Sequence, residues 1–175
     1  MRPLFLVGYM GCGKSTLARK IARRLGVEAV DTDRAVEERE GATVADIFRY
    51  EGEERFREVE REVLERLIAD PATRVVSTGG GLPLWCDNMA RMNEAGTTVY
   101  LRRSAEQIAR RLSPYGRQKR PRLRGLSDGE LVGFMARDIA EREPCYAQAR
   151  WVFDCDALSD DEVAENILSK IKNEK

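Results

Sequence analysis

The chain has 175 residues, the length of one α/β domain, and we treat residues 1–175 as a single folding unit. Thirty Lys and Arg residues balance thirty Asp and Glu residues, so the net charge of zero argues against a nucleic-acid partner. The four cysteines form no C-x-x-C pair and histidine is absent, which excludes the usual zinc ligand sets and a histidine general base. The sequence shows no export signal and no apolar run of membrane-spanning length, so we expect a cytoplasmic protein without a membrane partner.

The first predicted unit joins a strand to a helix through a phosphate-binding loop. Residues 4–7 form an apolar run, and the segment from Gly8 to Ser15 reads GYMGCGKS, which fits the pattern G-x4-G-K-S. Backbone amides of such a loop and the N-terminus of the following helix are suited to anionic phosphate oxygens. Lys14 would reach the β- and γ-phosphates of a nucleoside triphosphate, and the Ser15 hydroxyl would ligate Mg²⁺. The alternative is a glycine-rich turn without a function.

A second strand, residues 27–30, is predicted to deliver two carboxylates to the ligand-binding edge of the sheet. Asp31 and Asp33 follow that strand, and on an extended segment two residues two apart point to the same side, so both could face the nucleotide's metal. The alternative is a capping group beside a solvated turn residue. A capping pattern at Thr43 then precedes one helix, and an apolar stripe predicts another over about residues 53–69.

A third strand, residues 74–77, ends before Gly79, Gly80 and Gly81. Three glycines in a row expose backbone amides and permit close approach of a substrate, although a flexible loop is an equal alternative. The strand carries no Asp for a metal, so Asp31 is the candidate for that role.

The rest of the chain continues the alternation of helices and strands. We expect a helix over 83–94, a strand over 97–101, capped helices from residues 104, 127 and 159, and a strand over 151–153. The helix from residue 127 should end at about residue 142 or 143, before Pro144. Between about 112 and 126 the helical period is lost among Pro, Gly and Arg residues, which predicts a mobile cationic lid. The whole predicts a five-stranded parallel sheet with helices on both faces.

The order of these motifs resembles the shikimate kinase family, over nearly the whole chain. The matching segments are Gly8-x-Met10-Gly11-x-Gly13-Lys14-Ser15-Thr16, Asp31-x-Asp33, Gly52-Glu53-x-x-Phe56-Arg57-x-x-Glu60, Gly79-Gly80-Gly81, Arg120-Pro121 and Arg142-x-x-x-Tyr146. The resemblance implies a P-loop NTPase fold like that of nucleoside monophosphate kinases, with a substrate-binding segment at about 33–60. It also implies phosphorylation of the 3-hydroxyl of shikimate by ATP, with Mg²⁺, in aromatic amino acid biosynthesis, by a protein expected to be a monomer.

The resemblance further implies a role for each site residue. Asp33 would bind ring hydroxyls and take the proton of the 3-hydroxyl, and Asp31 would hold a metal-bound water. Arg57 and Arg142 would clamp the substrate carboxylate, a task that suits a planar guanidinium. Arg120 would meet the phosphates from the lid. The remaining substrate contacts would come from Gly79, Gly80 and Gly81, and the Gly80 backbone would approach the substrate so closely that no side chain fits there. The remaining ATP contacts would come from Gly11, Cys12, Gly13, Lys14, Ser15 and Thr16.

Two features leave alternatives open at this stage. By pattern alone, Arg57 suits a surface ion pair. A gluconate kinase-like enzyme is also possible, because its acceptor, gluconate, carries a carboxylate that two arginines could bind. Other rivals are a nucleoside monophosphate kinase-like enzyme and a non-catalytic nucleotide-binding protein. Arg122 departs from the family pattern, which usually has Leu after the lid proline, and neither its charge nor the adenine contacts are explained by the sequence.

Overall fold

The computed structural model describes residues 2–72, 74–118 and 121–173. Five strands form one parallel sheet in the order β2-β3-β1-β4-β5. Their bounds are β1 Leu4–Val7, β2 Glu28–Asp31, β3 Arg74–Ser77, β4 Thr97–Arg102 and β5 Trp151–Asp154. The predicted five-stranded parallel sheet is therefore confirmed.

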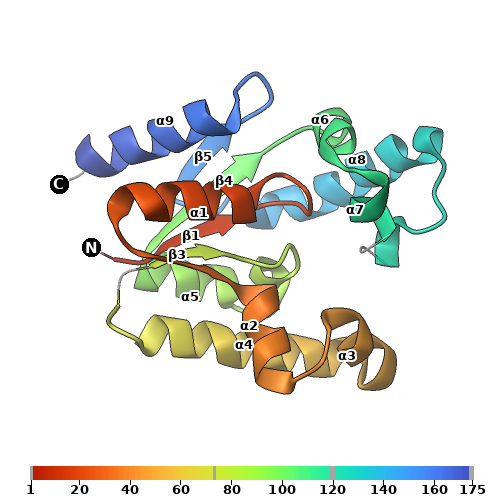
Figure 1. Cartoon of the computed structure of the whole chain (residues 1–175), viewed down its shortest axis with the longest axis horizontal. Helices are drawn as coiled ribbons and strands as arrows, with labels where there is room; N and C mark the ends of the chain where they lie inside the picture. Colours follow the sequence, from red (N-terminus) through yellow and green to blue (C-terminus); the bar gives the residue numbers. More distant parts are fainter. Residues whose placement is uncertain (1, 73, 119–120, 174–175) are drawn as a thin grey trace.

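Helices cover both faces of the sheet (Figure 1). Helix α1 (Lys14–Leu25) packs beside α9 (Asp160–Asn173) on one face, where Lys20 and Asp161 join them by an ion pair. Helices α5 (Asn88–Ala95) and α8 (Asp128–Tyr146) cover the other face. The central strand β1 is wholly buried because parallel strands covered on both sides need apolar side chains on both faces. None of the helices described is long and apolar enough to cross a bilayer.

The predicted substrate-binding segment, residues 33–60, contains a helix that the sequence pattern did not reveal. Strand β2 ends at Asp31 and helix α2 (Thr32–Glu40) begins at once. The prediction that Asp31 and Asp33 lie on one extended segment is therefore wrong. The reason is that Asp31 is the N-cap of α2, and its Oδ1 accepts hydrogen bonds from the backbone N–H of Asp33 and Arg34. Helices α3 (Val44–Tyr50) and α4 (Gly52–Ala69) follow and enclose a small second core.

The predicted helix over 83–94 is two elements, a 3₁₀ turn η1 (Leu82–Leu84) and α5, separated by a turn in which Cys86 has φ +48°. The predicted lid also differs. Between α6 (Ala105–Arg111) and α8 it contains a short helix α7 (Pro114–Gln118) and a 3₁₀ turn η2 (Pro121–Leu123). Helix α8 continues past Pro144 to Tyr146, whose hydroxyl donates to the backbone of Gly80 and so anchors that end.

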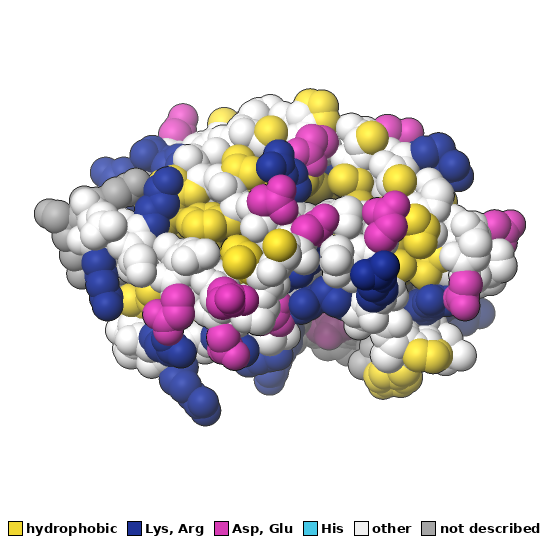
Figure 2. Space-filling view, turned by 90° about the horizontal axis from the view of Figure 1, so that it is seen from above, with side chains coloured by type: hydrophobic (Ala, Val, Ile, Leu, Met, Phe, Trp, Pro, Cys, Tyr) yellow, Lys and Arg dark blue, Asp and Glu magenta, His cyan; other side chains and the backbone are white. Residues whose placement is uncertain are grey.

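The surface carries charges of both signs. Figure 2 shows basic and acidic side chains interspersed over the face seen from above, with apolar groups between them. The pattern agrees with the zero net charge and shows no single-sign field on that face.

Candidate active site

The phosphate-binding loop connects β1 to α1, as the motif predicts. Gly8 and Gly13 have φ of +142° and +107°, and a Cβ at Gly8 would lie 2.9 Å from the Leu101 carbonyl oxygen, so the loop requires glycine there. Lys14 is buried, and its ammonium donates to the carbonyl oxygens of Gly8 at 2.7 Å and Tyr9 at 2.8 Å. These bonds keep a buried positive charge beside the loop that the motif assigns to phosphate.

The other predicted ATP-binding positions lie in or next to this loop. Gly11 has φ +80°, Thr16 is the third residue of α1, and the Cys12 side chain is completely buried. The Cys12 side chain therefore belongs to the core beneath the loop. Sequence reasoning missed Arg103, which is buried and donates through Nε to the Cys12 carbonyl at 3.0 Å. That bond secures the loop from the end of β4.

A set of oxygen atoms lies at the start of α1. The Ser15 hydroxyl donates to Asp31 Oδ2 at 2.6 Å and lies 3.1 Å from the hydroxyl of Ser77, the last residue of β3. Hydroxyl and carboxylate oxygens are ligands that suit Mg²⁺, which commonly uses one or two carboxylates together with substrate phosphates. The described ranges contain no group of three His, Cys, Asp or Glu side chains that could hold a metal. The donor set therefore fits a magnesium ion shared with a nucleotide better than a closed protein site.

Asp33 lies in the first turn of α2, against the glycine loop. A Cβ at Gly79 would be 2.4 Å from Asp33 Oδ1, and the Gly79 N–H donates to the Thr32 hydroxyl at 2.8 Å. Burial, and then the nearby Asp31 carboxylate, raise the pKa of Asp33 to about 6, although Lys14 and Arg57 favour its charged form. Asp33 is thus close to Lys14, the predicted phosphate-binding lysine, and to Arg57, a predicted carboxylate-binding arginine.

Arg57 is an ion-pair partner, one of the two alternatives that the sequence left open, and it lies against the glycine loop. It extends from α4, stacks over the Phe56 ring at 5.2 Å and forms ion pairs with Glu53, at 3.2 Å, and Glu60. A Cβ at Gly81 would be 2.3 Å from Arg57 Nη2, so the guanidinium lies directly against the glycine loop. Arg57 is therefore an ion-pair partner, but one that lies inside the site and not on an open surface.

Glu60 is a site residue for which sequence reasoning assigned no role. Its side chain is 1% exposed, and its Oε1 has no hydrogen-bond partner within the described parts of the chain. Burial raises the pKa of Glu60 to about 7, against the opposing effect of Arg57. A Cβ at Gly79 would lie 2.7 Å from Oε1, so the free oxygen faces the glycine loop.

The three residues of the glycine loop differ in how closely protein atoms approach them. The protein atoms nearest a Cβ at Gly80 would be at 3.5 Å or more, which is ordinary contact, whereas Gly79 and Gly81 are crowded by Asp33 and Arg57. The protein itself therefore leaves room at Gly80, and the expectation that a side chain there would meet the substrate stays a prediction. The Gly80 carbonyl accepts a 2.6 Å bond from the hydroxyl of Tyr146, which fixes the loop against α8.

Arg142 approaches from α8. Its Nε donates to Asp138 Oδ1 at 3.0 Å, and its guanidinium lies over the ring of Tyr9, 5.6 Å from the ring centre. Because Tyr9 belongs to the phosphate-binding loop, Arg142 lies beside that loop. Asp138 was not predicted. The remaining predicted site residue, Arg120, lies outside the described residues.

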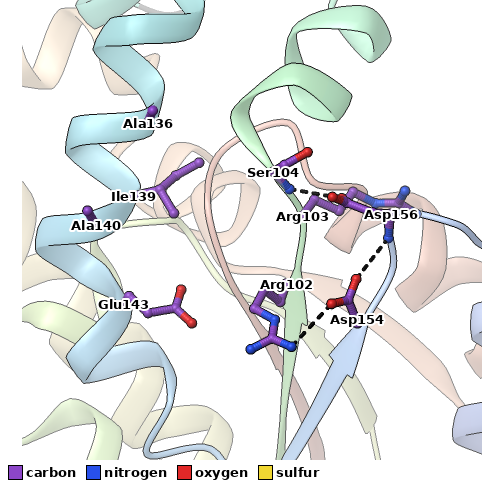
Figure 3. A pocket seen from close by; sticks show the side chains of 9 residues that line it. All are labelled: Arg102, Arg103, Ser104, Ala136, Ile139, Ala140, Glu143, Asp154 and Asp156. Atoms are coloured by element: carbon purple, nitrogen blue, oxygen red, sulfur yellow. Dashed lines mark hydrogen bonds and ion pairs between the residues drawn. The ribbon is translucent and has the colours of Figure 1, made fainter.

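A separate cavity of about 370 Å³ lies between α8 and the ends of β4 and β5 (Figure 3). Arg102 pairs with Asp154 at its wall, and the Ser104 N–H donates to Asp156 at 2.9 Å. None of the predicted site residues lines this cavity. The predicted site is instead the region where the phosphate-binding loop, the start of α2, α4, the glycine loop and α8 meet.

The comparisons with known proteins identify one family. The sequence model of the family described as shikimate kinase matches residues 10–172. A shikimate kinase from Parabacteroides distasonis is 42% identical over 174 residues, covering 98% of this chain and 99% of that protein. The crystal structure of a shikimate kinase from Bacteroides thetaiotaomicron is 37% identical, with a TM-score of 0.88 and 98% of both chains covered.

A second similar solved structure contains a bound ligand. The shikimate kinase from Acinetobacter baumannii, in complex with shikimate, is 32% identical to this chain, with a TM-score of 0.87, and the match covers 100% of this chain and 95% of that one. Similarity at these levels extends over the whole fold and not over the phosphate-binding loop alone. The chain belongs to the shikimate kinase family.

Proposed function

We propose that this chain transfers the γ-phosphoryl group of ATP to the 3-hydroxyl of shikimate, giving shikimate 3-phosphate and ADP for aromatic amino acid biosynthesis. The observation that carries the proposal is the contact of Asp33 and Arg57 with one glycine loop, Gly79 to Gly81, close to Lys14. A carboxylate to take a proton, a guanidinium to bind an acid and a phosphate-binding lysine are the groups that this reaction needs.

In the proposed mechanism Asp33 takes the proton of the 3-hydroxyl as its oxygen bonds to the γ-phosphorus, and the bond to the β,γ-bridging oxygen breaks to release ADP. A pKa of about 6 leaves Asp33 charged at neutral pH, yet able to accept a proton. Lys14 offsets the charge that develops on the phosphates, which is the main requirement of phosphoryl transfer. We also assign Arg120 to the phosphates, as the family resemblance implies.

Arg57 and Arg142 would hold the shikimate carboxylate from two sides. Each guanidinium is planar and keeps its orientation through a carboxylate partner, Glu60 for Arg57 and Asp138 for Arg142. Holding the acceptor in this way places its hydroxyl for in-line attack, and positioning supplies much of the rate in such reactions.

Mg²⁺, when bound with ATP, would neutralise the β- and γ-phosphate oxygens. Ser15 would contribute its hydroxyl, and Asp31 would hold a metal-bound water, since both oxygens lie at the start of α1. A monomeric state and a cytoplasmic location stay predictions.

A coupled ADP-release assay with ATP and Mg²⁺ tests the proposal. Shikimate, gluconate and a set of nucleoside monophosphates are compared as acceptors at equal concentration. We expect turnover with shikimate and none above the ATP hydrolysis background with the others. Activity with gluconate or a nucleotide alone would overturn the proposal, and a protein that binds ATP but uses no acceptor would support the non-catalytic alternative.

A further inference from the structure

One buried carboxylate joins three distant parts of the chain beside the active site. Asp138 lies in α8 and is 6% exposed. Its Oδ2 accepts bonds from the Tyr9 hydroxyl at 2.8 Å and from Arg122 Nη1 at 3.1 Å, and its Oδ1 accepts from Arg142 Nε at 3.0 Å. The phosphate-binding loop, the turn η2 of the lid segment and α8 therefore share a single anchor.

These contacts fix the orientation of the Arg142 guanidinium. The Nε bond to Asp138 and the Tyr9 ring below the guanidinium plane restrain a side chain that otherwise has several rotatable bonds. Among the residues that the structure describes, the hydrogen bonds of Arg142 use Nε alone. Its two Nη groups thus remain available to an incoming carboxylate, in the geometry that allows paired N–H···O bonds.

Arg122 is the third partner of Asp138 and comes from the turn η2. It is half-exposed, stacks over the Phe134 ring at 5.7 Å and reaches the oxygen of Asp138 that also binds Tyr9. The family usually has Leu at this position, and Leu could not pair with a carboxylate. The charge of Arg122 thus has a partner in α8, one turn from Arg142.

We propose that Asp138 is a positioning residue for the acceptor carboxylate: it orients Arg142 through Nε, and Arg122 holds Asp138 in place from the lid segment. The inference rests on the proposed function, because it assigns Arg142 to the acceptor. Charge-assisted hydrogen bonds to a buried carboxylate are strong, and a freed Arg142 would have to be ordered again by each substrate molecule. Loss of the anchor should therefore weaken acceptor binding and leave the chemical step nearly intact.

The test combines binding and kinetics on two variants of Asp138. Asp138→Asn removes the charge, and Asp138→Glu keeps the charge but moves the carboxylate by one methylene group. We expect both to raise the Kd for shikimate, measured by calorimetry, and the KM for shikimate by about tenfold or more, with kcat and the KM for ATP within about twofold. Because Asp138→Asn changes the charge and Asp138→Glu changes the position of the carboxylate, an effect common to both shows that the anchor needs the charge and its position together.

Three further variants serve as controls and as a safeguard against misfolding. Asp128→Asn weakens another ion pair between α8 and the lid segment, the pair of Asp128 with Arg117. Asp128 is exposed and lies 14 positions before Arg142 in the sequence, so this variant should leave the Kd for shikimate unchanged. Arg122→Leu should raise that Kd about threefold to tenfold even if both Asp138 variants fail to fold. Arg122→Lys should recover part of the loss because it keeps a cation beside Asp138.

A substrate analogue separates positioning from general damage. The methyl ester of shikimate has no carboxylate charge, so wild type and Asp138→Asn should bind it with equal, weak affinity. Equal shikimate affinity in wild type and both Asp138 variants would overturn the inference while leaving the proposed function intact. Tighter binding by Asp138→Asn would also overturn it, since the charge of Asp138 would then act as simple repulsion. Failure of wild type to bind shikimate at all would overturn both.

Discussion

The hydroxyl of Ser15 donates a 2.6 Å hydrogen bond to Asp31, which links the first residues of α1 to the end of β2. Asp31 uses its other oxygen to cap α2, so one side chain both starts the helix that carries Asp33 and contacts the predicted magnesium ligand. From the sequence, capping a helix and binding near a metal are alternative roles for Asp31. In the structure Asp31 caps α2 with one oxygen, and its other oxygen contacts Ser15, so the two roles are compatible. The acceptor and nucleotide sides of the site are thus connected through Asp31.

A first prediction concerns this link. Ser15→Ala should raise the Mg²⁺ concentration needed for half-maximal activity about tenfold or more, because a direct ligand oxygen is lost. Activity is measured across a magnesium titration at saturating ATP. Ser159→Ala is the matched control: it removes the serine cap of α9, and should lower stability by about 1 kcal/mol without altering the magnesium dependence. An unchanged magnesium curve in Ser15→Ala would exclude the hydroxyl as a ligand.

A second prediction concerns Asp33. Asp33→Asn should keep ATP affinity but lower kcat by at least about a hundredfold, the lower range of general-base effects. ATP binding is measured by calorimetry and turnover by ADP release. Glu38→Gln, an exposed change on the same helix, should leave both values unaltered. A variant with normal turnover would rule Asp33 out as the base.

Local patterns were enough to predict much of this molecule. The phosphate-binding loop, all five strands and the capping box at Ser127 depend on residues within a few positions of one another, and each is present. The resemblance assigned Asp33, Arg57 and the glycine loop to one substrate, and in the structure the two side chains lie against that loop. By contrast, α2 was missed because the Asp that caps it was interpreted as the continuation of a strand.

The unpredicted site residues share a physical reason. Tyr9 and Asp138 are 129 positions apart, and Arg103 and Cys12 are 91 apart, so no periodicity connects them. Glu60 lies among many exposed charged residues of α4, and only the fold shows that it points inward. Buried polar groups that act through distant partners carry no local signature, so such residues become visible only in the structure.

A third prediction follows from the glycine loop. Gly79→Ala and Gly81→Ala should displace the Asp33 carboxylate and the Arg57 guanidinium respectively, because a Cβ would overlap the ends of those side chains. We expect kcat to fall in Gly79→Ala and the KM for shikimate to rise in Gly81→Ala. Gly80→Ala has room in the protein, so its unfolding free energy should stay within about 0.5 kcal/mol of wild type.

Gly80→Ala then separates a steric role toward substrate from one in folding. If the Gly80 backbone approaches shikimate as the resemblance implies, the variant loses shikimate affinity at wild-type stability. Normal affinity together with normal stability would show that the acceptor does not come close to this residue. Urea unfolding and calorimetry with shikimate measure the two quantities on the same sample.

The fourth prediction is a pH dependence of stability that comes from Glu60. Its pKa is about 7 in the folded chain, against an ordinary value of 4.5, mainly through burial. Between these values the folded state binds more protons than the unfolded state, so the contribution of Glu60 to stability is lost as the pH rises toward 7. Arg57 favours the charged form and Asp33 and Glu53 oppose it, and burial outweighs the attraction of Arg57.

Glu60→Gln removes this titration and keeps the size of the side chain. The unfolding free energy of the variant, relative to wild type, should therefore increase by about 2 kcal/mol between pH 5 and pH 8. Urea unfolding at four pH values measures the difference, which contains the titration of Glu60 and its coupling to the nearby Asp33. Glu58→Gln, an exposed change on the same helix, should give a flat difference. A difference for Glu60→Gln that is flat or falls with pH would mean that Arg57 holds Glu60 ionised throughout, and that the buried pair is a permanent ion pair.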